Sequence, residues 1–269
     1  MRDVRPAAVA GTFYPGNAAE LAVAVRGCLA DVAIPVAPVA SPKALIVPHA
    51  GYVYSGPIAA GAYARLASVR SRIGRVVILG PTHRVAVRGL ALPSARAFAS
   101  PLGEVEVDRE AVAVLAGLPQ VVVSDSAHAL EHSVEVQLPF LQSVLDDFRI
   151  VPLAVGDASP GEVAEVLDRL WGGPETLVVV SSDLSHFHGY AQAREIDRAS
   201  AERILALAGP LDHEEACGAT PINGLLLCAR RRGLAPELID LRNSGDTAGD
   251  RSSVVGYASF AFAGERAHG

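Results

Sequence analysis

The chain has 269 residues, half of them hydrophobic, and carries a formal net charge of −6 at pH 7. This length suits one large α/β domain or two small ones, and the negative charge argues against a nucleic-acid surface, which requires clustered basic side chains. No apolar run approaches the roughly 18 residues that a membrane-spanning helix requires. We therefore expect neither nucleic acid nor a membrane among the partners.

The cysteines and the first residues indicate the compartment. Cys28, Cys217 and Cys228 form an odd, widely spaced set without a C-x-x-C pair. This spacing is typical of reduced thiols rather than of a disulfide framework. The first residues also lack the apolar core of a signal peptide. We expect a cytoplasmic protein.

Helices and strands are predicted to alternate along the chain. Helices are expected at 17–30, 57–67, 108–117, 131–144, 160–170, 190–207 and 221–232. Strands are expected at 44–48, 75–80, 104–108, 121–123, 150–155, 176–181, 236–242 and 253–262. The segments 5–15 and 32–43 are rich in Pro or Gly and are expected to be irregular.

Prolines set several of these boundaries. Pro57 and Pro160 suit the first turn of a helix, where the missing N–H costs nothing, and Ser159 is a suitable N-cap for the second of these helices. Pro139 lies inside the helix expected at 131–144 and predicts a kink or an early stop there.

The central strands are runs of apolar, mostly β-branched residues without alternation, as at 76–79 and 177–180. Such runs are typical of strands buried on both faces of a parallel sheet. Together with the alternation of helices and strands, they predict an α/β fold. We expect a single domain over residues 1–269, with a largely parallel or mixed central sheet flanked by helices.

Polar side chains that can bind a metal follow three of these strands. His49 follows a strand and a proline, and His83 follows a strand and a Pro-Thr pair. Asp183 follows a third strand, with His186 three residues further on. Because ligands of open parallel sheets bind beyond the carboxyl ends of the strands, we expect these side chains to meet at one edge. His49 and His83 are the expected metal ligands, although each could instead bind a loop backbone. Asp183 and His186 are the candidate catalytic residues; alternatively, Asp183 caps the turn that follows.

A third ligand is expected in the loop after the strand at 236–242. Gly245 lets the chain turn sharply and keeps Asp246 close to the strand end, so we favour Asp246 over Asp250 as a metal ligand. Two His and one carboxylate form the facial set of non-haem Fe(II) sites and leave coordination positions open. The alternative is an ordinary turn before the last strand.

The segment 128–132 matches the H-x-x-E-H pattern of inverted zincins, with His128 and His132 as ligands. Because this segment lies where a loop enters a predicted helix, we favour a different role. In that role Glu131 and His132 line the cleft from a helix N-terminus, and His128 binds no metal. Tyr52 and Tyr54 are expected to line the same cleft.

Cys217 lies just before the helix expected at 221–232. A thiol near a helix N-terminus can have a lowered pKa and act as a nucleophile or ligand. Because no firm His or Asp partner for it is evident from the sequence, we expect Cys217 to be structural.

Together, these blocks resemble the Memo family, in the bacterial branch often called AmmeMemoRadiSam system protein B. The likeness runs from residue 5 to about 262 and includes several blocks in the right order. The matching segments are 6–15 (PAAVAGTFYP), 47–56 (VPHAGYVYSG), 79–83 (LGPTH), 131–140 (EHSVEVQLPF), 181–186 (SSDLSH) and 244–246 (SGD).

The resemblance implies a fold similar to that of class III extradiol dioxygenases, such as the catalytic subunit of protocatechuate 4,5-dioxygenase, which hold Fe(II) with two His and one Glu. By position, His49 and His83 match the two His of the family's metal pocket, and Asp183 and His186 match polar residues that line it. Animal members have a Cys where this chain has Asp246 or Thr247. A thiolate favours copper and a carboxylate suits iron, so we expect iron, with copper or zinc as alternatives.

Two functions follow from the resemblance. The first is a metal-dependent oxidoreductase that binds a small molecule and O₂ at the open coordination positions, with His186 as acid and base. The second is a non-catalytic module that docks a peptide or a partner protein in the same cleft, with Tyr52 and Tyr54 in recognition. The bacterial family name also implies association with AMMECR1-like and radical SAM proteins.

Overall fold

The computed structural model describes residues 3–32 and 41–264, so most of the loop expected at 32–43 lies outside the described residues. The α-helices are α1 (Ala18–Ala30), α2 (Tyr52–Ala64), α3 (Arg109–Ala113), α4 (Asp125–Ala129), α5 (Leu138–Val144), α6 (Pro160–Leu170), α7 (Tyr190–Leu205) and α8 (Ala219–Arg231). The strands are β1 (Val4–Arg5), β2 (Ala44–Val47), β3 (Arg75–Pro81), β4 (Leu90–Leu92), β5 (Ala97–Ser100), β6 (Gly103–Glu106), β7 (Val121–Val123), β8 (Arg149–Val155), β9 (Thr176–Ser181), β10 (His186–His188), β11 (Leu234–Asn243) and β12 (Val254–Gly264). Short 3-10 turns are η1 (Ala67–Val69), η2 (Glu135–Gln137) and η3 (Ser244–Asp246).

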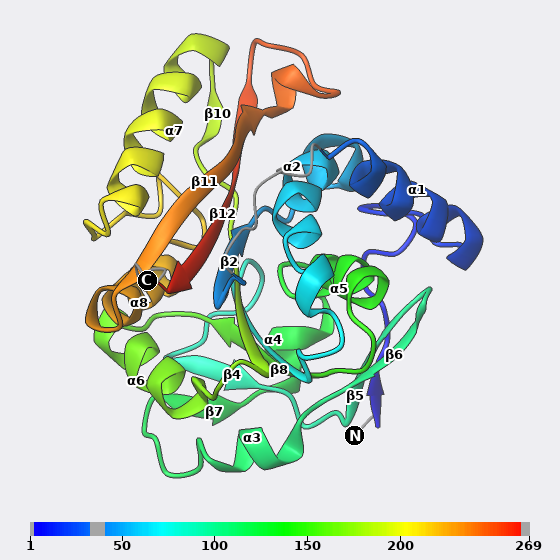
Figure 1. The fold of residues 1–269 in the computed structure, drawn as a ribbon, viewed down its shortest axis with the longest axis vertical. Helices are drawn as coiled ribbons and strands as arrows, with labels where there is room; N and C mark the ends of the chain where they lie inside the picture. The colour runs from blue at the N-terminus through cyan, green and yellow to red at the C-terminus, as the bar shows by residue number, and fades with distance from the viewer. Residues whose placement is uncertain (1–2, 33–40, 265–269) are drawn as a thin grey trace.

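A mixed central sheet organises the molecule (Figure 1). Its strand order is β10-β12-β2-β9-β3-β8-β4-β7, and β11 also pairs with β12. The four strands β2, β9, β3 and β8 run parallel to one another, whereas β12 is antiparallel to β2 and β4 is antiparallel to β8. Every residue of β2 and β9 is buried, as expected for unbroken apolar runs. The predicted α/β fold with a largely parallel or mixed sheet is confirmed.

Helices cover both faces of this sheet. The helices α1, α2 and α5 lie on one face, and α6 and α8 lie on the other, so that alternate residues of each central strand enter different cores. In β2, for example, Ile46 belongs to the core that contains α6 and α8, and Leu45 belongs to the core that contains α1, α2 and α5. The sheet is therefore a rigid support for the loops at its edge.

Capping residues explain where two of the helices begin. Ser159 Oγ accepts from Glu162 N–H while the Glu162 carboxylate accepts from Ser159 N–H, and Pro160 opens α6 as predicted. Asn17 Oδ1 accepts from the N–H groups of Ala19 and Glu20 at the start of α1.

Two predicted helix starts are clearly wrong, and both involve proline. Helix α2 begins at Tyr52 rather than at Pro57, because Tyr52 N–H donates to Phe13 O and fixes the first turn there. The helix expected at 131–144 begins only at 138, and Pro139 lies in its first turn instead of interrupting it. Residues 131–134 are consequently free to form an irregular segment beside the sheet edge.

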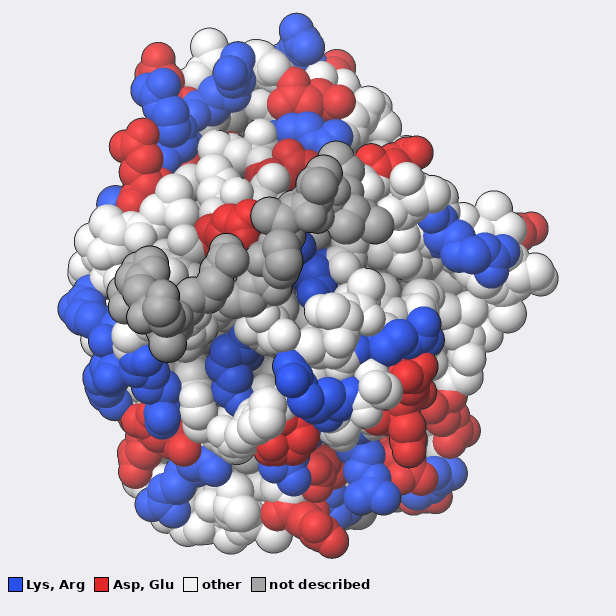
Figure 2. All heavy atoms as spheres, in the orientation of Figure 1, with Lys and Arg blue, Asp and Glu red and all other residues white. Residues whose placement is uncertain are grey.

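A second, small sheet of order β1-β5-β6 lies beside the main one and ties the N-terminal residues to the middle of the chain. Basic and acidic side chains are interspersed over the face seen in Figure 2. Within the described residues, no helix is long and apolar enough to cross a membrane.

Candidate metal centre

Two strand ends and one irregular segment build the candidate site. His49 follows β2 after a single proline, and His83 follows the last residue of β3 by two positions. The parallel strand β9 separates β2 from β3, so both strands end at the same edge of the sheet. His132 comes from the irregular segment between α4 and η2, which passes the same edge.

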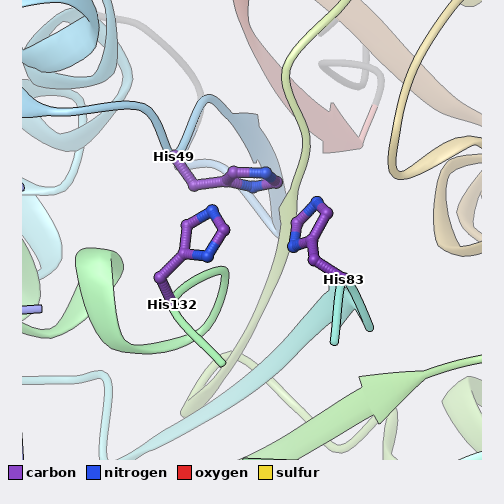
Figure 3. Close-up of side chains that lie close together, drawn as sticks. All are labelled: His49, His83 and His132. Carbon is purple, nitrogen blue, oxygen red and sulfur yellow. The ribbon is translucent and has the colours of Figure 1, made fainter. Parts of the chain in front are cut away.

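The side chains of His49, His83 and His132 converge, as Figure 3 shows. Each offers one ligand atom, and these atoms all lie within 4.8 Å of one another. The ring centroids of His83 and His132 are 4.6 Å apart and nearly parallel, and the His49 ring meets both edge-on at 5.2 and 5.3 Å. Three imidazoles gathered in this way can hold a divalent transition metal.

A buried hydrogen-bond network fixes the tautomer of His49. Ser181 Oγ lies 2.6 Å from Ser133 O, and because a carbonyl only accepts, the single Ser181 proton is used there. Gln137 Nε2 donates to Ser181 Oγ at 2.8 Å, so the remaining lone pair of Ser181 accepts from His49 Nδ1–H at 2.8 Å. His49 therefore carries its proton on Nδ1 and presents a bare Nε2 lone pair, which is the form that binds a metal.

Glu131 holds the other two histidines. Its carboxylate accepts from the backbone N–H and the ring Nδ1 of His83, at 2.7 and 2.9 Å, and from the backbone N–H groups of His132 and Ser133, at 2.9 and 3.0 Å. Burial alone would raise the pKa of Glu131, but the hydrogen bonds from His83 outweigh it and lower the pKa to about 2. A permanent carboxylate beside His83 keeps the proton of that ring on Nδ1 and leaves its Nε2 free.

Two of the three histidines, His132 and His49, are held in their neutral form. Burial lowers the pKa of His132 to about 4, and the neighbouring His83 contributes in the same direction against the attraction of Glu131. His49 is 1 % exposed, and burial holds its pKa well below the usual range, with His132 and His83 adding to the effect. Neutral imidazoles near pH 7 are ready to donate lone pairs to a metal.

A glycine makes the approach of the His132 segment possible. A Cβ on Gly80, in β3, would lie 2.4 Å from Ser133 Oγ and 2.8 Å from Ser133 Cβ. Because Gly80 lacks a side chain, Ser133 packs directly on the strand, and its Oγ donates to Pro81 O at 2.9 Å. This contact brings Glu131 and His132 next to His83.

The N-terminal residues fasten the same segment from outside. Glu135 forms a buried ion pair with Arg5, accepts from Tyr14 O–H, and accepts from the N–H groups of Ala8 and Val9 at 2.8 and 3.0 Å. Phe13 packs on the His132 ring at a centroid distance of 4.6 Å. Residues 5–14, expected to be irregular, thus brace the segment that carries His132.

Asp183 and His186 lie in the segment after β9, at the same sheet edge. Asp183 Oδ1 accepts from His49 N–H at 2.8 Å, so the carboxylate holds the backbone of a candidate ligand, and burial raises its pKa to about 7. His186 opens β10, and burial lowers its pKa.

Asp246 is not brought to the histidines. Its Oδ2 accepts from Asn243 N–H at 3.1 Å, and its Oδ1 accepts from Tyr190 O–H, so the carboxylate closes η3 against α7. Strand β12 separates β11 from β2, which places this loop one strand away from His49. Among the described residues, the group within ligand distance contains His132 instead of the expected Asp246.

The remaining predicted residues have separate places. Tyr52 is buried and donates from its hydroxyl to Val136 O at 2.7 Å, so it packs beneath the site, whereas Tyr54 is 38 % exposed. His128 points away into the protein, where its Nε2 lies 2.9 Å from Ala91 O.

Cys217, expected to be structural, lies close to the histidines: its Sγ is 3.3 Å from His49 Nε2. The sequence gives no local signal for this last contact, because it joins residues far apart in the chain.

Comparisons with known proteins agree with these observations. The Memo family model, described as Memo-like protein, matches residues 5–261. A MEMO1 family protein of Ignicoccus hospitalis is 38 % identical, over 96 % of this chain and 98 % of its own, and one of Sulfolobus acidocaldarius is 34 % identical, over 96 % and 99 %. A third, of Methanopyrus kandleri, is 38 % identical over 96 % and 98 %. These relatives are archaeal, so the bacterial origin stays a prediction.

A solved structure shares the fold. The uncharacterized protein JW3007 of Escherichia coli K12 superposes with a TM-score of 0.50 at 15 % identity, over 81 % of this chain and 98 % of that one. The fold class predicted from the sequence is confirmed. Because the family model and the relatives span almost all of the sequence, the chain belongs to the Memo family.

Proposed function

We propose that this chain binds one divalent transition metal through His49, His83 and His132 and uses it in an oxidoreductase pocket like that of class III extradiol dioxygenases. The convergence of three histidine ligand atoms within 4.8 Å, from three separate segments, carries the proposal. Support also comes from the hydrogen bonds of Ser181 and Glu131, which leave a ring nitrogen of His49 and of His83 free.

The donor set fits iron, copper and zinc. Three neutral imidazoles suit each of these ions and fill only part of the coordination shell, so positions remain for other ligands. The expected set of two His and one carboxylate would have selected more strongly for iron. We propose iron on the strength of the extradiol dioxygenase resemblance, with copper and zinc as the alternatives that metal analysis separates.

The surrounding residues have distinct roles in this proposal. A bound metal supplies Lewis acidity and open positions for a small molecule and O₂. Burial lowers the pKa of His186, so the neutral ring can act as a base. In this proposal it accepts a proton from a hydroxyl group of the bound small molecule and then donates that proton back as an acid. Asp183 keeps His49 in place through the backbone N–H and, with a pKa of about 7, can hold a proton near neutral pH.

Metal analysis of the purified protein tests the proposal. We expect wild-type protein to retain stoichiometric metal, and we expect His49→Ala, His83→Ala and His132→Ala each to weaken binding at least about tenfold. His128→Gln is the matched control, because His128 belongs to the same H-x-x-E-H segment but contacts Ala91 O instead of the cluster. Full metal content in a variant lacking all three histidines of the cluster would overturn the proposal.

One observation favours the binding-module alternative. Phe187 is 77 % exposed beside His186 and has a φ of 63°, a conformation that costs energy in a residue other than glycine. An exposed aromatic side chain held in this way suits the docking of an apolar peptide side chain. If purified wild-type protein contains no metal, the binding-module function is favoured. Co-purification tests the proposed AMMECR1-like and radical SAM partners.

We also propose a cytoplasmic location. The three cysteines are free thiols in the structure, as a reducing compartment requires. Fractionation of cells that produce the chain tests this location.

A further inference from the structure

The thiol of Cys217 occupies a specific place beside the three histidines. Its Sγ lies 3.3 Å from His49 Nε2, and on its other side it accepts from Asp183 N–H at 3.3 Å. Gly218 fixes this position, since a Cβ there would lie 2.8 Å from Ser181 O and 2.6 Å from Ser182 Cβ. The loop before α8 is therefore packed directly against the end of β9, and Cys217 faces the site.

The protonation of His49 Nε2 determines the kind of contact that Cys217 makes. Because Ser181 accepts the proton of His49 Nδ1, the Nε2 atom carries a lone pair and no hydrogen. His49 is 1 % exposed, so this lone pair is shielded from water. The contact is thus an S–H···N hydrogen bond, and the thiol lies next to the lone pair with which His49 would bind a metal.

The distance fits two ligands of one metal. A tetrahedral ion about 2.0 Å from nitrogen and about 2.3 Å from sulfur holds these atoms about 3.5 Å apart, close to the observed 3.3 Å. Cys217 is outside the group of three histidines, whose ligand atoms lie up to 4.8 Å apart and must themselves move closer around an ion.

We propose that Cys217 is a further ligand of the metal held by His49, an inference that rests on the proposed metal site. When metal binds, the Nε2 lone pair is donated to the ion, a metal–sulfur bond replaces the S–H bond, and the thiol proton is released to solvent. The site then offers a thiolate as well as imidazoles. A thiolate selects thiophilic ions, so Cys217 shifts the preference of the site toward zinc and Cu(I).

Cobalt spectroscopy tests the inference without any assay of activity. Co(II) added to the metal-free protein should give visible bands of a bound ion and, in addition, the near-ultraviolet charge-transfer band of a cobalt–thiolate bond. We expect Cys217→Ser to lose the charge-transfer band while keeping the visible bands. Cys228→Ser is the matched control, since Cys228 is a buried thiol beside Ala164 O, and it should keep both.

A second variant keeps the test decisive if Cys217→Ser does not fold. The chain has three cysteines, so a Cys28→Ser, Cys228→Ser double variant leaves Cys217 as the sole thiol and should retain the charge-transfer band. Co(II) bound by the wild type without that band, or a band that survives in Cys217→Ser, overturns the role of Cys217 and leaves the metal site standing. Failure of wild-type protein to bind Co(II) at all overturns both.

Discussion

Glu131 shows how much of the site depends on a single carboxylate. It accepts four hydrogen bonds, from the backbone N–H groups of residues 83, 132 and 133 and from the ring of His83. Only a charged carboxylate has enough acceptor sites for all of them. The residue is therefore a positioning group for two of the proposed ligands.

Glu131→Gln should consequently weaken metal binding by about ten- to a hundredfold. The amide offers one oxygen instead of two, so at least one buried N–H loses its acceptor, and the free energy of unfolding should fall by about 1–3 kcal/mol. A competition titration with a chelator and a denaturant titration measure the two effects. Glu162→Gln, which alters the cap of the remote helix α6, should leave metal affinity unchanged; equal affinity in Glu131→Gln and wild type would contradict the role.

His128 predicts a pH dependence of stability in the metal-free protein. Burial lowers its pKa to about 4 in the folded chain, against an ordinary value of 6.5 for histidine. Between these values the unfolded chain binds a proton that the folded chain does not, so the stability that neutral His128 contributes is lost as the pH falls from 6.5 to 4. The loss reaches about 3 kcal/mol at pH 4.

Denaturant titrations of wild type and His128→Gln across this range isolate the effect. Burial raises the pKa of Asp183 to about 7 and of Asp197 to about 6, which opposes the trend in both proteins and cancels in the difference. The advantage of wild type over the variant should shrink as the pH falls. A constant difference from pH 7 to pH 4 would mean that His128 is not buried in its neutral form.

At the scale of elements, ligands of a parallel sheet bind beyond the carboxyl ends of its strands, and this explains which site residues the sequence could predict. His49 and His83 follow strands whose apolar runs are readable in the sequence, so the sequence predicts the sheet edge at which both lie in the structure. For His132 the sequence predicts only a position lining the cleft, because the segment resembles the start of a helix. In the structure that helix begins seven residues after Glu131. Asp246 follows a strand that was also identified, but the intervening β12 is a property of sheet order that no local pattern reveals.

Gly80 tests the contact between β3 and the His132 segment. A Cβ at this position would lie 2.4 Å from Ser133 Oγ, so Gly80→Ala must displace the segment that carries Glu131 and His132. We expect weaker metal binding and a loss of about 1–3 kcal/mol in the free energy of unfolding. Both are measured by the chelator and denaturant titrations described for Glu131.

Gly27→Ala is the control for this substitution. Gly27 lies within α1, and a Cβ there would meet nothing within 4 Å. This change should stabilise the protein by about 0.5–1 kcal/mol and leave metal affinity unaltered. Normal metal binding by Gly80→Ala would show that the segment can reach the site without packing on the strand.

At the scale of the whole molecule, the site joins parts of the chain that are distant in sequence. The N-terminal residues reach Glu135, two parallel strands deliver His49 and His83, and the loop before α8 delivers Cys217. The two layers of helices hold the sheet between them, so the strand ends have little freedom to move. A site assembled in this way forms only when the entire fold is complete.

The hydrogen bonds behind His49 also have a direction. Tyr63, buried in α2, donates to Gln137 Oε1 at 2.8 Å, which turns the amide so that its Nε2 faces Ser181 and Pro48 O. Each donor therefore dictates the orientation of the next, and the last consequence is a His49 Nε2 without a hydrogen. The free lone pair of His49 Nε2 thus depends on the direction of every hydrogen bond in this network. The network begins at the Tyr63 hydroxyl, which does not contact the site.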